Sequence, residues 1–249
     1  MIIFSRNRTE TTFDTELAEA IATRFHTNVL SIPFFYDLRS FGATLRRLRA
    51  LKEPSLFLAS FPERATKNLL THLEIKEVTV VMDISNTDTD RIFEFIAGAD
   101  DLFLISENSG GNVERLDELT VKRWYPVIDL GECIGCLECL NFCLFGVYVI
   151  GRDKKPVTDQ PDACRDGCPA CARVCPGAAI MFPMHDDPDI SGRTDARTVR
   201  QKVRIDLFRA EEERRHQVKP DKSNEPNKLE PNELDDLVEQ IDRFDYRQF

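Results

Sequence analysis

The sequence predicts an α/β N-terminal domain with a mostly parallel sheet, a small cysteine-rich α+β domain and a helical C-terminal extension. Three observations support this fold class. Short apolar runs alternate with helix-like stretches up to about residue 112, and all eight cysteines lie in one window of 43 residues. Beyond that window the sequence is polar and charged, with apolar residues at helical spacing. The expected segments are the α/β domain (1–112), a linker (113–123), the cysteine-rich domain (124–186), a basic helix (187–219), a disordered linker (220–231) and an amphipathic helix (232–249).

The alternation in the first segment is typical of a parallel sheet. Each apolar run is short enough for a strand, and the stretches between the runs are helix-like. Strand, helix, strand in this order favours a sheet that helices cover on both faces. Gly110 and Gly111 then predict a hinge or a plain turn. The expected strands are 2–4, 29–32, 56–59, 78–82 and 102–105, and the expected helices are 13–25, 41–51, 63–73 and 89–97.

The best candidate for a ligand site in this domain is the polar loop of residues 5–12. It follows the first expected strand, where open α/β sheets place their ligands. Its hydroxyls and arginines could hold a flavin phosphate, and the loop faintly resembles those of flavodoxins. However, the glycines that such loops use for close approach are missing, and the domain has neither G-x-G-x-x-G nor G-x-x-x-x-G-K-[ST]. We therefore favour a solvated loop over a flavin site.

The cysteines form two runs with a spacing suited to iron-sulfur clusters. The runs are Cys133-x2-Cys136-x2-Cys139-x3-Cys143 and Cys164-x3-Cys168-x2-Cys171-x3-Cys175-Pro176. Three thiols spaced two residues apart can wrap one face of a compact cluster. The fourth thiol, which a turn follows, then points elsewhere, and bacterial two-cluster iron-sulfur proteins share ligands in this way. The spacing therefore predicts a protein that carries electrons.

Three other interpretations of the cysteines are weaker. A disulfide framework needs an oxidising compartment, and the N-terminal residues 1–6 lack the basic and apolar regions of a secretory signal. Paired zinc sites are a closer competitor, but zinc ribbons separate two C-x-x-C pairs by roughly 15 to 20 residues. Free structural cysteines do not explain two runs of four.

The segment from about Tyr125 to Phe182 resembles a bacterial-type ferredoxin domain with two 4Fe-4S clusters. The resemblance covers about a quarter of the chain and implies crossed ligation, in which each cluster takes three cysteines from one run and the last cysteine of the other. Each cluster then ties the two halves of the domain together, so this region is not expected to fold without metal. The implied ligand sets are Cys133, Cys136, Cys139 and Cys175 for the first cluster, and Cys164, Cys168, Cys171 and Cys143 for the second.

The strands of this domain are expected to be short. Residues 126–128 would pair near residues 179–182, and a second hairpin would join 147–150 to 156–158. Trp124 and Tyr125 are expected to pack where the two domains meet. The apolar residues expected to seal the clusters from water are Ile134, Leu137, Leu140, Phe142, Leu144, Phe145, Ala178, Ile180 and Phe182.

Two departures from the ferredoxin pattern fall on the second ligand set. The second run opens with three residues, 165–167, where the usual spacing is two, and Leu144 follows Cys143 in place of a proline. Gly167 softens the first departure, because glycine adopts backbone angles closed to other residues. We therefore expect the cluster with Cys143 to be the one with an altered potential or greater lability.

Composition excludes several classes of function. The net charge of −10 argues against nucleic acid as a partner, because phosphate contacts need a basic surface. No apolar stretch approaches the ~18 residues of a membrane span, and we expect a cytoplasmic protein. Residues 124–189 hold ten acidic and five basic side chains. Such a surface suits docking to a basic patch on a redox partner, although an acidic surface is often merely solvated.

The C-terminal segments suggest further contacts. Residues 190–219 hold nine basic and five acidic side chains and form a helix candidate, which either folds back on the acidic domain or meets a partner. Asn232 can cap a last helix, and an amphipathic helix needs a groove on a partner protein or on this chain. Its apolar stripe is Leu234, Leu237, Val238, Ile241 and Phe244.

Three functions remain open at this point. We favour an electron carrier, or an electron-transfer subunit of an oxidoreductase, without catalysis of its own. The first alternative is a reductase whose N-terminal domain is fed by the clusters, and a bound flavin or other cofactor would indicate it. The second is a redox-sensing or scaffold protein, and rapid reversible reduction by a physiological donor would argue against it.

Overall fold

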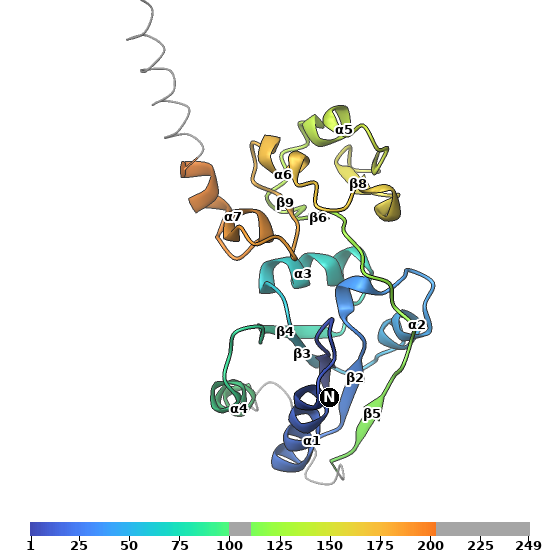
Figure 1. The fold of residues 1–249 in the computed structure, drawn as a ribbon, viewed down its shortest axis with the longest axis vertical. Coiled ribbons are helices and arrows are strands. Elements are labelled where there is room, and N and C mark those ends of the chain that lie inside the picture. Colours follow the sequence, from blue (N-terminus) through green and yellow to red (C-terminus); the bar gives the residue numbers. More distant parts are fainter. Residues whose placement is uncertain (100–110, 203–249) are drawn as a thin grey trace, which may run out of the picture. The chain divides into compact units, whose positions relative to one another are not determined.

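The computed structural model describes residues 1–99 and 111–202, and residues 1–202 form one compact unit. The N-terminal part contains a five-stranded sheet in the order β4-β3-β1-β2-β5, in which every pairing is parallel (Figure 1). This confirms the predicted fold class of the domain. The strands are β1 (Ile2–Ser5), β2 (Val29–Ile32), β3 (Ser55–Ala59), β4 (Val78–Asp83) and β5 (Val113–Arg115).

Helices cover both faces of this sheet. Neighbouring residues of a strand point to opposite faces, so Ile2 and Phe4 face one side and Ile3 faces the other. The first side packs against α1 and α4, and the second against α2 and α3. These helices are α1 (Thr12–Phe25), α2 (Ala43–Arg49), α3 (Glu63–His72) and α4 (Thr89–Gly98), and a short 3-10 helix, η1, spans Phe35–Asp37.

The cysteine-rich part consists of two small two-stranded antiparallel sheets and two short helices. Strand β6 (Val127–Ile128) pairs with β9 (Ile180–Met181), and β7 (Tyr148–Ile150) pairs with β8 (Pro156–Thr158). Both pairings occur where the sequence predicts them. The helices α5 (Glu138–Phe142) and α6 (Ala170–Val174) contact each other, and a 3-10 helix, η3, spans Pro161–Ala163.

Two tyrosines join the sheet domain to the cysteine-rich part. The rings of Tyr36 and Tyr125 are stacked, with centroids 4.3 Å apart and planes 10° apart. The Tyr125 backbone N–H donates to the Tyr36 hydroxyl (2.8 Å), and the Tyr125 hydroxyl donates to the Tyr36 carbonyl (2.8 Å). The Tyr36 hydroxyl in turn donates to the Tyr125 carbonyl. Both residues are buried, and Tyr125 therefore packs at the junction, as predicted.

A half-buried ion pair supports the same junction from helix α3. Arg64 Nε lies 2.8 Å from the carboxylate of Asp129, and Arg64 Nη2 donates to the carbonyl of Ala178 (2.9 Å). Trp124 was also expected at the junction, but it packs within the cysteine-rich part instead. Its ring stacks on Phe182 with centroids 5.2 Å apart, and its Nε1 donates to the carbonyl of Cys168 (3.1 Å).

The structure differs from the expected segments in two places. Strand β5 comes from residues 113–123, which were expected to be only a linker, and it pairs with β2. The segment expected as one basic helix from residue 187 contains α7 (Pro188–Ser191), which ends at Gly192 with a φ of +89°. A second helical stretch then covers residues 196–202.

Some of the expected segments lie outside the described residues. These are the strand at 102–105, Gly110, the continuation of the basic helix beyond residue 202, the linker at 220–231 and the amphipathic helix at 232–249. Within residues 1–99 and 111–202, no helix is long and apolar enough to cross a membrane.

Candidate iron-sulfur centre

Four cysteines from the two runs line one cavity of about 150 Å³. Cys143 comes from the end of the first run, and the other three come from the second run. These four cysteines are the set that the ferredoxin resemblance implies for the second cluster. The remaining lining is apolar, which suits an iron-sulfur cluster because such a cluster is sheltered from water. The lining residues are Pro126, Phe142, Cys143, Leu144, Phe145, Val147, Tyr148, Cys164, Cys168, Ala170 and Cys171.

The first ligand set is drawn together around helix α5. Cys139 is buried on this helix, and burial raises its pKa, with charge repulsion from Cys175 of the other run and from Cys171 and Cys133 adding to the effect. Cys175 Sγ accepts a hydrogen bond from the backbone N–H of Ala179 (3.3 Å). Cys136 is exposed. Thiols of both runs therefore lie within electrostatic reach of Cys139.

All eight cysteines are free thiols, so the structure contains none of the disulfides weighed above. In the described part of the chain, no three His, Cys, Asp or Glu side chains converge closely enough to hold a single metal ion. The four sulfurs of the second set instead surround a cavity. That arrangement fits a multi-iron cluster, because such a cluster would lie between the four sulfurs and keep them apart.

Burial makes the thiols hard to ionise when no metal is bound. It raises the pKa of Cys139 and of Cys164 to about 12 each, and the pKa of Cys171 to about 11. Neighbouring thiolates add to the effect by charge repulsion. Only the thiolate form binds iron. Cluster assembly must therefore release these protons, and the positive charge of the iron must stabilise the resulting thiolates.

The loop between Cys164 and Cys168 depends on glycine for its backbone angles. Gly167 has a φ of +73°, and a Cβ at this position would meet nothing within 4 Å. The glycine is therefore required for its conformation and not for space. This explains how the second run accommodates one residue more than the usual spacing.

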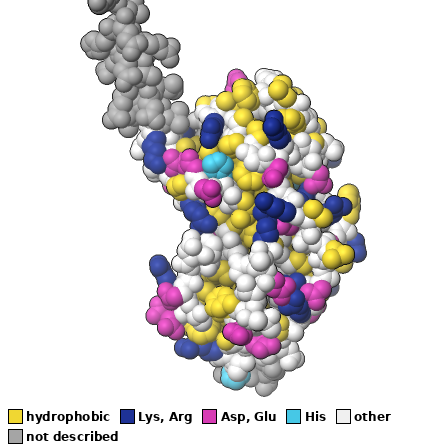
Figure 2. Space-filling view, in the orientation of Figure 1, with side chains coloured by type: hydrophobic (Ala, Val, Ile, Leu, Met, Phe, Trp, Pro, Cys, Tyr) yellow, Lys and Arg dark blue, Asp and Glu magenta, His cyan; other side chains and the backbone are white. Residues whose placement is uncertain are grey.

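The apolar shield is less complete than the sequence suggested. Ala178, Ile180 and Phe182 are buried as expected. By contrast, Leu144 is 91 % exposed, and the other exposed members of the predicted shield are Ile134, Phe142 and Phe145. Leu144 stands where ferredoxins have a proline, and the backbone turns it outward. Hydrophobic side chains are accordingly visible on the surface of this part in Figure 2.

Tyr148 is the site residue that the sequence analysis missed. It is buried at the start of β7, and its hydroxyl donates a hydrogen bond to Cys171 Sγ (3.0 Å). A signal was present in the sequence, because Tyr148 follows Cys143 by five residues and Ile180 follows Cys175 by the same number. The two halves therefore differ at this matched position, where one has a tyrosine and the other has an isoleucine.

The polar loop after β1 is tied to partners within the protein. The Asp14 carboxylate accepts hydrogen bonds from the backbone N–H groups of Asn7 (3.0 Å) and Thr11 (2.8 Å) and from both side chains. Arg8 forms two hydrogen bonds to Asp37 (2.7 and 2.6 Å). Most of the loop groups that could have bound a flavin phosphate therefore already form hydrogen bonds within the protein.

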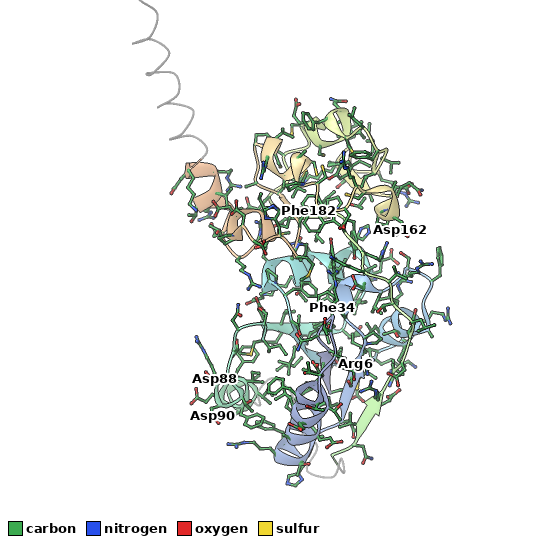
Figure 3. All side chains as sticks on the ribbon, viewed as in Figure 1. Arg6, Phe34, Asp88, Asp90, Asp162 and Phe182 are labelled. Carbon is green, nitrogen blue, oxygen red and sulfur yellow. The ribbon has the colours of Figure 1, made fainter. Side chains whose placement is uncertain are left out.

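A cavity of about 310 Å³ remains beside this loop. Arg6, which follows β1, and Phe34, which follows β2, line this cavity, and both are labelled in Figure 3. Arg6 is buried, and its Nη1 has no hydrogen-bond partner among the described residues. Its other terminal nitrogen donates to the carbonyl of Leu116 (2.9 Å) and to Asp117 (3.1 Å). Carboxylates of Glu10, Asp117 and Glu118 line the cavity. Their charge disfavours a phosphate group there.

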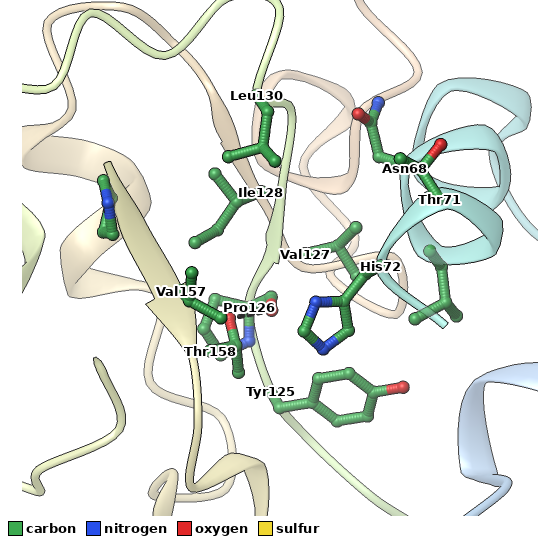
Figure 4. Close-up of a pocket in the computed structure, with 12 residues that line it drawn as sticks. Asn68, Thr71, His72, Tyr125, Pro126, Val127, Ile128, Leu130, Val157 and Thr158 are labelled. Carbon is green, nitrogen blue, oxygen red and sulfur yellow. Dashed lines mark hydrogen bonds between the residues drawn. The ribbon is translucent and has the colours of Figure 1, made fainter. Parts of the chain in front are cut away.

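A small apolar pocket of about 40 Å³ lies where α3 meets β6 and β8. Figure 4 shows the His72 ring beside Tyr125 and Val127. Burial lowers the pKa of His72, because the charged ring loses water contacts. This volume has room for little more than water, so the pocket belongs to the packing of the junction.

Comparisons with known proteins agree with this geometry. Residues 125–208 match the family model of a 4Fe-4S dicluster domain. The chain is 41 % identical over 61 residues to an uncharacterized ferredoxin of Methanocaldococcus jannaschii, a match that covers 24 % of this chain and 41 % of that protein. It is 33 % identical over 73 residues to an uncharacterized ferredoxin-like protein of Escherichia coli K12 (25 % of this chain and 31 % of that protein).

A third relative is a subunit of a named enzyme. The B subunit of polysulfide reductase from Wolinella succinogenes is 33 % identical over 70 residues, which are 24 % of this chain and 35 % of that protein. The chain thus spans less than half the length of each of these relatives. The matched family model spans the cysteine-rich part, and the ferredoxin relatives support an iron-sulfur electron-transfer role. Residues 125–208 are therefore similar to ferredoxin-type 4Fe-4S domains, and this part of the chain follows an N-terminal α/β domain.

Proposed function

We propose that the protein is an electron carrier, or an electron-transfer subunit of an oxidoreductase, that holds two 4Fe-4S clusters. One observation carries the proposal: Cys143 from the first run and three cysteines of the second run line the same apolar cavity. Crossed ligation assigns this cavity to one cluster, held by Cys143, Cys164, Cys168 and Cys171. It assigns Cys133, Cys136, Cys139 and Cys175 to the other. Each bound cluster supplies reversible uptake of one electron.

The protein side chains and amides then set the conditions for this transfer. Val147 and Pro126 exclude water from the cavity, and Trp124 anchors the backbone of Cys168 through its Nε1 hydrogen bond. The backbone N–H of Ala179 donates a hydrogen bond to Cys175 Sγ (3.3 Å). Such donors stabilise added negative charge on a bound cluster, so they raise its reduction potential.

A protein is the partner best suited to this site. Leu144 and Phe142 are exposed directly beside Cys143, where a partner could approach the cavity closely. The excess of acidic side chains in residues 124–189 adds a charge that a basic partner surface would complement. The similarity to the B subunit of a polysulfide reductase supports the version in which the protein serves as a subunit.

The α/β domain offers little support for the alternative function, a reductase whose N-terminal domain is catalytic. Asp14 and Asp37 occupy the donors of the loop after β1, and acidic side chains line the neighbouring cavity. A visible spectrum that shows only iron-thiolate absorption after anaerobic purification is the expected result. A stoichiometric flavin band would favour the reductase instead.

Iron counting on paired variants tests the crossed ligation. The anaerobically reconstituted protein should hold about eight irons and eight sulfides per chain and should show paramagnetic signals of reduced 4Fe-4S clusters. Cys143→Ala combined with Cys171→Ala should remove one cluster and leave about four irons. The matched control, Cys143→Ala combined with Cys139→Ala, should remove both clusters.

The opposite pattern, in which Cys143 and Cys139 act on the same cluster, would show uncrossed ligation. Colourless protein, or protein that contains zinc in place of iron, would reject the proposed function as a whole.

A further inference from the structure

We propose that the Tyr148 hydroxyl raises the reduction potential of the cluster held by Cys143, Cys164, Cys168 and Cys171, and so makes the two clusters unequal. The inference rests on the proposed function and adds a residue that sets the potential at one site. Its basis is the hydrogen bond of 3.0 Å from the Tyr148 hydroxyl to Cys171 Sγ.

This hydrogen bond lies out of contact with bulk water. Tyr148 is 7 % exposed and Cys171 is 8 % exposed, and both belong to one buried cluster of side chains. Val147 and Phe182 belong to the same cluster. In such surroundings the interaction between a donor and a charged acceptor is stronger than in water.

The direction of the effect follows from charge. A sulfur ligated to iron carries negative charge, and an O–H group can only stabilise that charge by donating to it. Reduction adds one electron to the cluster, so the reduced form gains more from the donor than the oxidised form. A donor to a ligand sulfur therefore raises the potential.

The hydroxyl is the donor in this pair, because a thiolate ligated to iron carries no proton. Among the described residues, Cys171 Sγ is the acceptor of its hydrogen bond.

The other half of the domain has no equivalent side-chain donor. Tyr148 follows Cys143 by five residues, and Ile180 occupies the matching place after Cys175. Ile180 is buried and has no polar side-chain atom. The donor to Cys175 Sγ is a backbone group, the N–H of Ala179 (3.3 Å). The Tyr148 hydroxyl therefore has no counterpart at the matching position of the other half.

Two replacements at this position test the inference in opposite directions. Tyr148→Phe removes the oxygen and keeps the ring, and it should lower one of the two midpoint potentials and leave the other unchanged. We expect a change of up to tenfold in the equilibrium constant for reduction, or about 59 mV for one electron. Site-specific 3-fluorotyrosine at position 148 is a stronger donor and should raise the same midpoint. Both are measured by titration of the anaerobically loaded protein, followed by electron paramagnetic resonance.

The matched control is Tyr125→Phe, which removes another buried tyrosine hydroxyl. That hydroxyl donates to the Tyr36 carbonyl (2.8 Å) and does not line the cysteine cavity. Both potentials should be unchanged in this variant.

Iron and sulfide counts separate the inference from the proposed function. Full iron content with unchanged potentials in both replacements at position 148 would overturn the inference and leave the electron-transfer role intact. If Tyr148→Phe loses a cluster, the 3-fluorotyrosine protein provides the test. A midpoint potential that fails to rise in that protein would also overturn the inference. An absence of iron in the unmodified protein would remove the proposed function itself.

Discussion

Asp14 and Asp37 hold the polar loop after β1 in place. Asp14 is fully buried and accepts hydrogen bonds from the backbone and side chains of Asn7 and Thr11. Asp37 is 2 % exposed, pairs with Arg8 through two hydrogen bonds and also accepts the backbone N–H of Arg123 (3.0 Å). Carboxylates at these positions make the loop a structural element of the protein.

Asp37→Asn tests the buried pair. The substitution removes the negative charge and leaves Arg8 without its ionic partner, and we expect a loss of about 3 kcal/mol in the free energy of unfolding. Urea unfolding of the cluster-loaded protein, followed by circular dichroism under argon, measures the change. The control is Arg47→Ala, which breaks an exposed pair with Glu114 (3.1 Å) and should have an effect below about 1 kcal/mol. Equal effects of the two variants would contradict the assignment.

His72 gives a prediction of pH dependence. Burial lowers its pKa, so its titration midpoint should lie below the ordinary value of about 6.5. As the pH falls below 6.5, the unfolded protein takes up a proton that the folded protein does not, and this residue then lowers stability. The midpoint follows from the ring proton resonances, which His72→Gln identifies by their loss. A midpoint at or above that of the denatured protein would contradict the prediction.

At the scale of elements, most strands and helices follow from local patterns in the sequence. Strand β2 covers the predicted residues, and both antiparallel strand pairs of the ferredoxin-type domain occur where the sequence predicted them. Strand β5 was missed because Val113, Glu114 and Arg115 carry one apolar side chain among two charged ones. It is a strand because its backbone pairs with β2, and sequence patterns do not report that pairing.

Gly167→Ala tests the lengthened loop of the second run. A residue with a Cβ at a φ of +73° costs about 1 kcal/mol or more, so the cluster held by Cys164, Cys168 and Cys171 should become more labile. Loss of iron to a chelator, followed by absorbance, measures the rate. Gly98→Ala is the control, since this glycine lies at the end of helix α4 in open space and alanine favours helix. An unchanged rate in Gly167→Ala would show that the loop tolerates the strain.

At the scale of the whole described unit, the junction explains why residues 1–202 behave as one body. Tyr125, Val127 and Met181 belong to the same core cluster as Ile3 and Phe57 of the sheet. The ferredoxin-type domain thus shares a core with its neighbour. The sequence indicated that Tyr125 would pack at the junction, but the interlocked hydrogen bonds with Tyr36 depend on residues 89 positions apart in the chain and could not be predicted.

The shared core predicts the outcome of truncation. A fragment of residues 1–202 should bind as much iron as the full-length protein. A fragment of residues 124–202 should aggregate or retain less iron, because it exposes Tyr125, Val127 and Met181. Iron content per chain after anaerobic reconstitution compares the two fragments. Full iron binding by a monomeric 124–202 fragment would show that the core is not needed.

The tyrosine interlock also bears on how the protein matures during synthesis. A ribosome makes the chain from its N-terminus, so Tyr36 and the five strands of the sheet are complete before the first cysteine is added. The cysteine-rich part can then pack against a sheet domain that is already synthesised, with the Tyr125 ring stacked on Tyr36. We therefore expect the sheet domain to form before the clusters are loaded, and to support the cysteine-rich part while iron is inserted.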